Sequence, residues 1–225
     1  MYDLKTWFLL FMIYSFIGWI LEIIDTVYMY RKIVNRGFLI GPYCPIYGFG
    51  ALFIIYFLHP YTDSPLILFF MTIVICAILE YITSYLMEKV FKARWWDYSD
   101  RRFNIDGRVC LDTLIPFGVG GCVILYLANP FFIRCLSLIP NMMLMIVAII
   151  LFVIILMDNL VSFKVILNFK KVATTIRKDS TEEMSKRVRT VLASKSFLGK
   201  RLMSAFPNVQ AIIKNYNAKR KKKCE

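Results

Sequence analysis

The sequence predicts an all-α polytopic membrane protein with about five transmembrane helices and a cytosolic, helical, basic tail. Three observations predict this class. The 225 residues are 59% hydrophobic with a mean hydropathy of +0.60, more apolar than an ordinary soluble domain. The apolar residues lie in long runs, several of about 20, the length that crosses a bilayer as a helix. Residues 164–225 carry 17 Lys/Arg and 4 Asp/Glu, so the whole net charge of +13 belongs to the tail.

Five apolar runs make up the predicted transmembrane domain, residues 1–163. Four of them cover about residues 6–27, 66–87, 111–127 and 141–163, and the second begins with a broken entry within residues 35–51 and runs to about residue 58. The second and fourth runs begin among glycines and prolines, which predicts a broken start rather than a smooth helix. Residues 128–140 contain two prolines and are expected to form a loop, and residues 164–225 form the tail.

The distribution of Lys and Arg predicts the orientation in the membrane. With five spans, the two ends of the chain lie on opposite sides. The loops after the first and third spans carry nine Lys/Arg, whereas the opposite side carries only Lys5 and Arg134. We therefore predict a multi-pass cell-membrane protein with its N-terminus outside and its C-terminus in the cytoplasm.

Two glutamates lie inside predicted spans, Glu22 in the first and Glu80 in the third. A charged residue within a span costs about 3 kcal/mol on insertion scales and usually faces a partner or a water-filled cavity. We expect both glutamates to face one polar cavity open to the cytoplasm, with Asp25 near its edge. Arg108 or Arg36 is expected to neutralise part of their charge. Snorkelling to the membrane surface is the alternative, and it is favoured for Asp25.

An internal sequence repeat relates the two glutamates to each other. Residues 20–24 (ILEII) resemble residues 78–82 (ILEYI), 58 positions later. Residues 45–50 (PIYGFG) resemble residues 115–120 (IPFGVG), 70 positions later. Chance similarity between apolar runs is the alternative explanation.

Each repeat unit holds two spans, about residues 6–58 and 66–127, and both units run in the same direction through the membrane. This predicts a pseudo-twofold axis along the membrane normal, with Glu22 and Glu80 as counterparts. Small residues let helices approach closely. The glycines expected at the helix contacts are Gly48, Gly50, Gly118, Gly120 and Gly121.

The loop between the third and fourth spans, residues 88–107, reads EKVFKARWWDYSDRRFNIDG. Its length, charge and aromatic content exceed what a simple connector needs. Tryptophans and tyrosines also settle at membrane–water interfaces, so an interfacial anchor is the alternative. In the functional interpretation, residues 95–104 close the cavity. Its candidate residues are Asp97, Tyr98, Asn104 and Arg108, with Arg36, Arg101 and Arg102 as secondary candidates.

The sequence lacks the residues that several classes of function require. His59 is the only histidine, which leaves almost no material for a His-based zinc site or a Ser-His-Asp triad. No GxxxxGK[ST] phosphate-binding loop occurs, so the chain is not itself a P-loop ATPase. The six cysteines show no paired metal-binding spacing. We therefore predict no metal and no cofactor.

The tail ends in a basic cluster that is expected to lie near the membrane. Such a cluster binds anionic lipid headgroups with about 1 kcal/mol per residue near the surface. This position favours lipid over nucleic acid, so no nucleic-acid partner is predicted. The candidate lipid-binding residues are Lys219, Arg220, Lys221, Lys222 and Lys223.

The motif RGFLIGPYCPIYGFG, the Leu-Glu ends of the first and third spans, and the motif WWDYSDRRFNIDGRVCLDTLIPFGVGG lie within residues 9–127. Together they resemble the type IV ABC-transporter family, the CmpB-like permeases of Gram-positive bacteria. The resemblance implies a bacterial membrane protein with a role in transport. Residues 115–118 (IPFG) depart from the family pattern, in which serine and tryptophan are expected before the glycine. This departure weakens any role assigned to that stretch.

Three functions follow from these observations as alternatives. The favoured one is a membrane permease or transport-associated subunit, completed by a second copy or a partner chain and driven by a separate ATPase. The second is an integral-membrane enzyme acting on a lipid at the cytoplasmic face, with Glu22, Glu80 and Asp97 as bases or Mg²⁺ ligands. The third is a membrane scaffold that recruits partners through its basic tail.

Overall fold

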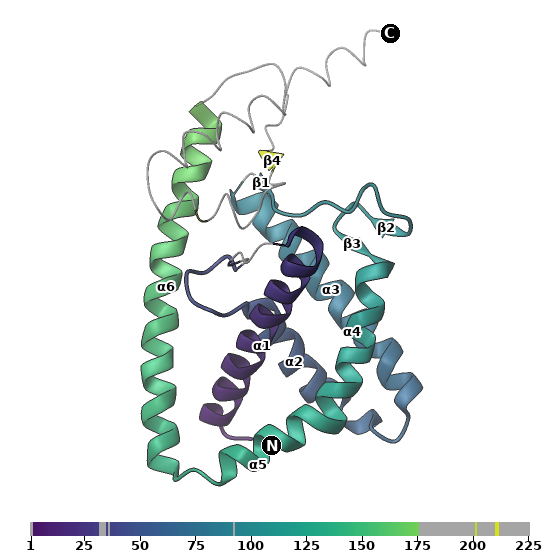
Figure 1. Cartoon of the computed structure of the whole chain (residues 1–225), viewed down its shortest axis with the longest axis vertical. Helices are drawn as coiled ribbons and strands as arrows, with labels where there is room; N and C mark the ends of the chain where they lie inside the picture. Colours follow the sequence, from purple (N-terminus) through teal and green to yellow (C-terminus); the bar gives the residue numbers. More distant parts are fainter. Residues whose placement is uncertain are drawn as a thin grey trace.

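The computed structural model describes residues 2–31, 35, 37–91, 93–175, 201 and 210–211. These residues are mostly helical, which confirms the predicted all-α class (Figure 1). The elements in chain order are α1 (Leu4–Tyr30), α2 (Pro45–Leu58), η1 (His59–Tyr61), α3 (Pro65–Phe91), β1 (Ala93–Arg94), β2 (Asn104–Ile105), β3 (Val109–Cys110), α4 (Leu111–Val123), η2 (Ile124–Ala128), α5 (Asn129–Ser137), α6 (Asn141–Thr175) and β4 (Gln210–Ala211).

Four helical stretches are long and apolar enough to cross a membrane: Leu4–Tyr28, Pro65–Phe91, Leu111–Ser137 and Asn141–Lys164. The remaining predicted span, the second along the chain, corresponds to helix α2, which is shorter and has 14 residues. At 1.5 Å per residue it measures about 21 Å, less than the roughly 30 Å of a bilayer core. The predicted broken start accounts for its length, because residues 37–44 are not helical and α2 begins only at Pro45.

The prediction of a loop over residues 128–140 was wrong for most of that segment, because α5 continues the helix to Ser137. Pro130 is tolerated because it lies in the first turn of α5, where the backbone N–H that proline lacks is not needed. The π-helix η2 joins α4 to α5, and the Asn129 N–H bonds to the Ile124 carbonyl, five residues back.

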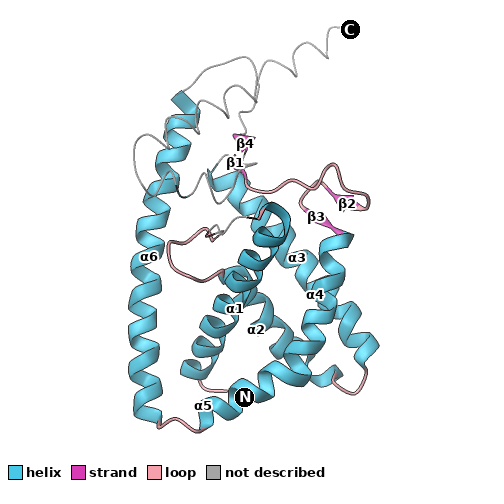
Figure 2. Ribbon diagram, viewed as in Figure 1, coloured by secondary structure: helices cyan, strands magenta, loops and turns pink. Residues whose placement is uncertain are grey.

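The helices form two antiparallel hairpins, α1 with α2 and α3 with α4 (Figure 2). Helix α5 crosses the end of the molecule that carries the N-terminus, and the strands β1, β2 and β3 lie at the opposite end. We call the latter the loop end. Between the hairpins, an apolar cluster includes Leu10, Ala51, Ile54, Leu68 and Leu125. The middle of the bundle is therefore held by hydrophobic packing.

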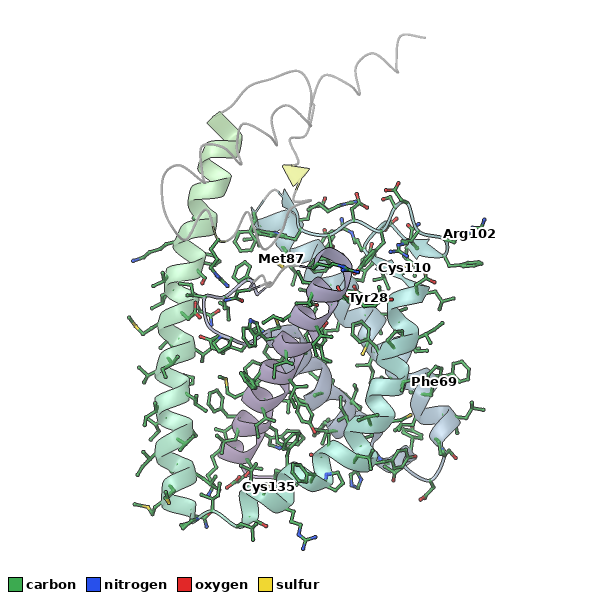
Figure 3. The ribbon with its side chains drawn as sticks, viewed as in Figure 1. Tyr28, Phe69, Met87, Arg102, Cys110 and Cys135 are labelled. Carbon is green, nitrogen blue, oxygen red and sulfur yellow. The ribbon has the colours of Figure 1, made fainter. Side chains whose placement is uncertain are left out.

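Helix α6 runs along one side of the bundle, and its side chains project outward along much of its length (Figure 3). Ile149 and Met157 are exposed, whereas Leu144, Ala148 and Ile155 are buried. An exposed apolar surface of this extent suits a helix that faces lipid on one side. The helix continues to Thr175 and so crosses the predicted end of the transmembrane domain at residue 163.

Four of the five predicted contact glycines lie against a neighbouring helix. A Cβ atom built on Gly48 would lie 2.3 Å from Ser15 Oγ, and one on Gly121 would lie 2.2 Å from Thr72 Oγ1. Gly118 packs against Phe69, and a Cβ atom built on Gly50 would lie 3.5 Å from Leu79 Cδ2. The prediction fails for Gly120, where a Cβ would meet nothing within 4 Å because this position points away from the neighbouring helix.

The described part of the tail contacts two loops at the loop end. Strand β4 pairs antiparallel with β1. The Arg201 guanidinium donates to the Gly37 carbonyl at 3.1 Å and also to the Leu39 carbonyl. Burial lowers the pKa of Arg201, although the carboxylate of Asp158 acts in the opposite direction. The proposed lipid-binding cluster at residues 219–223 lies outside the described residues.

Candidate functional site

Glu22 is held in place by a tyrosine from the second helix of its own hairpin. The Tyr47 hydroxyl donates to Glu22 Oε1 at 2.7 Å. The Tyr47 ring packs flat against α1 at Gly18, where a built Cβ would lie 2.2 Å from Tyr47 Cγ. Gly18 lies one turn before Glu22 on α1, so any larger residue there would displace the ring and its hydroxyl. The glycine at position 18 therefore permits this contact when α1 and α2 pack together.

Glu80 is the most enclosed carboxyl group of the predicted site, with only 8% of the residue exposed. Its side chain hydrogen-bonds to Tyr98 of the loop between α3 and α4, and the charge of Glu22 acts on it. Its Oε2 atom is buried and has no hydrogen-bond partner among the described residues. The structure thus brings together Glu22, Tyr47, Glu80 and Tyr98 from α1, α2, α3 and the loop.

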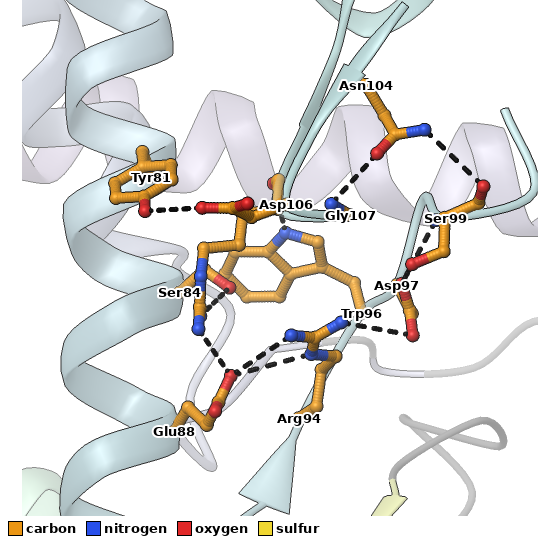
Figure 4. Close-up of polar contacts among 11 residues, drawn as sticks. Tyr81, Ser84, Glu88, Arg94, Trp96, Asp97, Ser99, Asn104, Asp106 and Gly107 are labelled. Atoms are coloured by element: carbon orange, nitrogen blue, oxygen red, sulfur yellow. Dashed lines mark hydrogen bonds and ion pairs between the residues drawn. The ribbon is translucent and has the colours of Figure 1, made fainter. Parts of the chain in front are cut away.

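The rest of the loop is organised by its own polar groups (Figure 4). Asp97 accepts hydrogen bonds from the Ser99 backbone N–H at 3.0 Å and from the Ser99 hydroxyl at 2.5 Å. Burial alone raises the pKa of Asp97, but these hydrogen bonds and the positive charge of Arg94 outweigh it and lower the pKa overall. The Asn104 side chain donates to the Arg101 carbonyl at 2.7 Å. Asp97 and Asn104 therefore shape the loop.

Arg108 makes its ion pair with Glu88 rather than with the deeper acids. Its Nη2 lies 2.7 Å from Glu88 Oε2, and its Nη1 donates to the Ser84 hydroxyl at 3.3 Å. The guanidinium carbon also lies 5.7 Å from the Tyr81 ring centroid and 5.6 Å from that of Tyr85, within cation–π range. These contacts fasten the end of the loop to the last turns of α3.

A second carboxylate, Asp158 on α6, anchors the segment that precedes α2. Its oxygens accept hydrogen bonds from the backbone N–H groups of Ile40 and Gly41 at 2.9 and 2.7 Å. They also accept from the hydroxyls of Tyr43 at 2.6 Å and Ser162 at 2.8 Å. Four donors satisfy this carboxylate, so its role is to join α6 to the α1–α2 segment.

The remaining candidates lie outside this cluster. Asp25 is exposed on α1, and Arg101 is exposed and lies 3.9 Å from Asp112. Arg102 is exposed at the loop end, close to Cys110 in Figure 3. Arg36 lies outside the described residues. Across the part of the chain that the structure describes, no group of three or more His, Cys, Asp or Glu residues could hold a metal ion.

One pocket of about 510 Å³ lies at the end opposite the loops. Asp3, Lys5, Ile133 and Asn141 contribute to its lining. It contains none of the predicted site residues.

The amino-acid sequence matches the family described as "Putative ABC-transporter type IV" over residues 9–163. The chain belongs to this family. No curated protein and no solved structure matches it. Family membership and the long apolar helices together identify a multi-pass membrane protein associated with ABC transport. The matched region contains Glu22, Tyr47, Glu80, Tyr98 and Asp158, so every element of the polar site is part of the family region.

Sequence reasoning missed Tyr47 and Gly18. Tyr47 lies inside the repeat motif PIYGFG, and Gly18 precedes Glu22 by four residues, the spacing that places two residues on one helical face. A tyrosine hydroxyl is also a common donor to a buried carboxylate. The sequence therefore contained the residues of this contact, but only the packing of α1 against α2 showed that they meet.

Proposed function

We propose that this chain is the membrane subunit of an ABC transporter and that its solute pathway passes Glu22 and Glu80. The observation that carries the proposal is the burial of Glu80 within α3, with one carboxyl oxygen that has no partner among the described residues. Family membership supports the role in transport. Because the sequence has no phosphate-binding loop, ATP hydrolysis requires a separate subunit.

The contrast with the other acids of the helices supports a functional role for this pair. Asp158 receives four hydrogen bonds, and Glu88 is paired with Arg108 and Arg94. Both have the partners expected of a structural carboxylate. Glu80 is more enclosed, yet one of its oxygens has no partner among the described residues. An incompletely satisfied acid within a span is typical of an ion or substrate pathway.

The position of the pair fits a pathway between two halves of a transporter. In transporters built from repeated units, binding sites lie where the units meet. Here Glu22 belongs to the α1–α2 hairpin and Glu80 to the α3–α4 hairpin. The hydrogen bond from Tyr98 of the loop to Glu80 supports a role for residues 95–104 as a cover over the pair. Movement of this loop would open the site.

Purification of the full chain from its native membrane in mild detergent tests the proposal. We expect a protein with a phosphate-binding loop to copurify, and the complex to hydrolyse ATP in nanodiscs. Glu22→Gln and Glu80→Gln keep the side-chain shape and remove the ionisable carboxyl group, so we expect each to change the hydrolysis rate about tenfold, which corresponds to about 1.4 kcal/mol. Asp63→Asn, at an exposed position in the connection between η1 and α3, is the matched control and should leave the rate unchanged.

Two results would contradict the proposal. The first is a purified chain with no nucleotide-hydrolysing subunit. The second is a complex whose ATP hydrolysis is the same for wild type and both glutamine variants. If deletion of residues 164–225 abolishes hydrolysis while the glutamine variants leave it unchanged, the scaffold alternative gains support, consistent with the contact of β4 with β1.

A further inference from the structure

The two helix hairpins make the same close contact at corresponding positions. Gly48 of α2 packs against Phe11 and Ser15 of α1. Gly118 of α4 packs against Phe69 and Ile73 of α3. The two α3 residues follow their α1 counterparts by 58 positions, and Gly118 follows Gly48 by 70, the same spacings that relate the repeated sequence motifs. This correspondence supports the treatment of the hairpins as counterparts.

Counterpart residues also meet each other between the hairpins. The Tyr47 and Phe117 rings, 70 positions apart, are in edge-to-face contact with centroids 6.1 Å apart. Glu22 and Glu80, 58 positions apart, interact electrostatically. Contacts between equivalent residues are expected near a pseudo-twofold axis. The glutamate pair therefore lies where the environments of the two acids should be alike.

One hydroxyl group breaks this equivalence. Tyr47 donates to Glu22, but its counterpart Phe117 has no hydroxyl to give to Glu80. Tyr98 supplies one hydrogen bond to Glu80 from the loop. The second carboxyl oxygen of Glu80, Oε2, is buried and has no partner among the described residues.

The charged groups around Glu80 do not compensate for the missing donor. The titratable groups that interact with Glu80 are Glu22 of α1, Cys76 one turn earlier on α3, and Tyr98 of the loop. Each is acidic or neutral. Arg108, the buried arginine of this region, is paired with Glu88. Burying a carboxylate without full pairing is far more costly than burying a neutral polar group without a partner.

We propose that Glu80 is a proton-binding site, held as the neutral acid beneath Tyr98. One proton from water bonds to a carboxylate oxygen, and no electrons are exchanged. Because Tyr98 belongs to the loop, lifting the loop removes its hydrogen bond and admits water, which lets the proton leave toward the loop end. The inference rests on the proposed function only in assigning this proton to a transport pathway.

Infrared difference spectroscopy of the full chain in nanodiscs tests the proposal, because a neutral carboxylic acid has a C=O stretching band that a carboxylate lacks. At neutral pH we expect this band in the wild type and its loss in Glu80→Gln. In Glu22→Gln the band should still be present at acidic pH, since Glu80 remains. The band should disappear from the wild type at alkaline pH.

Phe117→Tyr supplies the sharper comparison, because it restores at the second hairpin the hydroxyl that Tyr47 provides at the first. A hydrogen bond stabilises the ionised carboxylate more than the neutral acid, so the ratio of ionised to neutral Glu80 should rise about tenfold or more. We expect a correspondingly weaker band at neutral pH. Phe131→Tyr, at an exposed position on α5, is the matched control and should leave the band unchanged.

Absence of the neutral-acid band in the wild type would overturn the proposal, as would its survival in Glu80→Gln. A band of equal strength in Phe117→Tyr and the wild type would overturn the role of the missing hydroxyl. The measurement needs neither solute nor ATPase. A band that behaves as expected in a chain that binds no ATPase therefore contradicts the proposed function and leaves the proton site standing.

Discussion

At the scale of single residues, the presence or absence of one group decides how closely the helices approach and how each acid is satisfied. Gly18 admits the ring of Tyr47, whose hydroxyl then reaches Glu22. Gly48 admits the side chains of Phe11 and Ser15. In both cases the absent Cβ matters because the neighbouring atoms would lie closer than real Cβ contacts allow.

Gly48→Ala should lower the thermal stability of the protein in detergent. The new Cβ would lie 2.3 Å from Ser15 Oγ and 2.7 Å from the Phe11 backbone carbonyl, so α1 and α2 would have to separate. Overpacking of this kind costs about 1–3 kcal/mol. The measurement is the unfolding midpoint followed by circular dichroism or by intrinsic tryptophan fluorescence.

Gly120→Ala is the matched control, because its Cβ would meet nothing within 4 Å. Alanine favours a helix over glycine by about 1 kcal/mol, so this variant should be unchanged or slightly more stable. Equal destabilisation by both substitutions would show that the close α1–α2 contact is not responsible.

At the scale of elements, hydrogen bonds and an ion pair of polar side chains join segments that are separate in the chain, at two places. Asp158 joins α6 to the segment before α2, and Arg108 joins the loop after β2 to α3 through Glu88 and Ser84. Helix α6 packs only partly on the bundle, since most of its apolar surface is exposed. The hydrogen bonds of Asp158 add to the packing of Leu144, Ala148 and Ile155 in attaching α6 to the bundle.

Asp158→Asn should release the segment before α2. The amide keeps one acceptor oxygen, so it loses the charge and at least one of the four hydrogen bonds, at a cost on the order of 2–4 kcal/mol. Cys44, which is 8% exposed and follows Tyr43, reports the release. We expect its alkylation by a maleimide, mapped by mass spectrometry, to accelerate about tenfold or more.

Asn159→Ala serves as the control on the same helix. Asn159 is exposed, and its side chain donates only to the Ile155 carbonyl of its own helix. Its replacement should leave the reactivity of Cys44 at the wild-type rate. If Cys44 of the Asp158→Asn variant also reacts at that rate, the hydrogen bonds of Asp158 do not hold the segment before α2 in place.

At the scale of the whole molecule, the polar chemistry is gathered at one end. The strands β1, β2 and β3 and the strand β4 of the tail lie at the loop end, opposite α5 (Figure 1), and the loop between α3 and α4 carries Tyr98 and the Arg108 ion pair. The predicted orientation places this end in the cytoplasm, where an ATPase subunit would bind.

Cysteine labelling tests this orientation. In a background without the native cysteines, Asp100→Cys at the loop end should react with a membrane-impermeant maleimide only after the cells are opened. Asp63→Cys, in the short connection between η1 and α3, should react in intact cells. Both native residues are exposed, so access is not limited by packing. The reverse pattern would overturn the predicted sidedness and the placement of the ATPase.

The class of the protein, its long helices and the two unusual acids follow from the sequence alone. Run length has to match bilayer thickness, and a charge inside an apolar run is conspicuous whatever the fold, so Glu22 and Glu80 could be selected without coordinates. The motifs also led to the correct family. By contrast, helix continuity through Pro130 could not be predicted, because it depends on the π-helix η2 that shifts the hydrogen-bond register.

Only the tertiary structure decided which hydrogen-bond donor or cation each carboxylate meets. The Tyr47 hydroxyl meets Glu22 across 25 residues of chain, and the Tyr43 hydroxyl meets Asp158 across 115. Arg108, a candidate partner of the deep acids in the sequence, binds Glu88 instead. Hydrogen bonds act over about 3 Å, so which donor reaches which carboxylate depends on how the helices pack. The same packing leaves Glu80 Oε2 buried without a donor among the described residues.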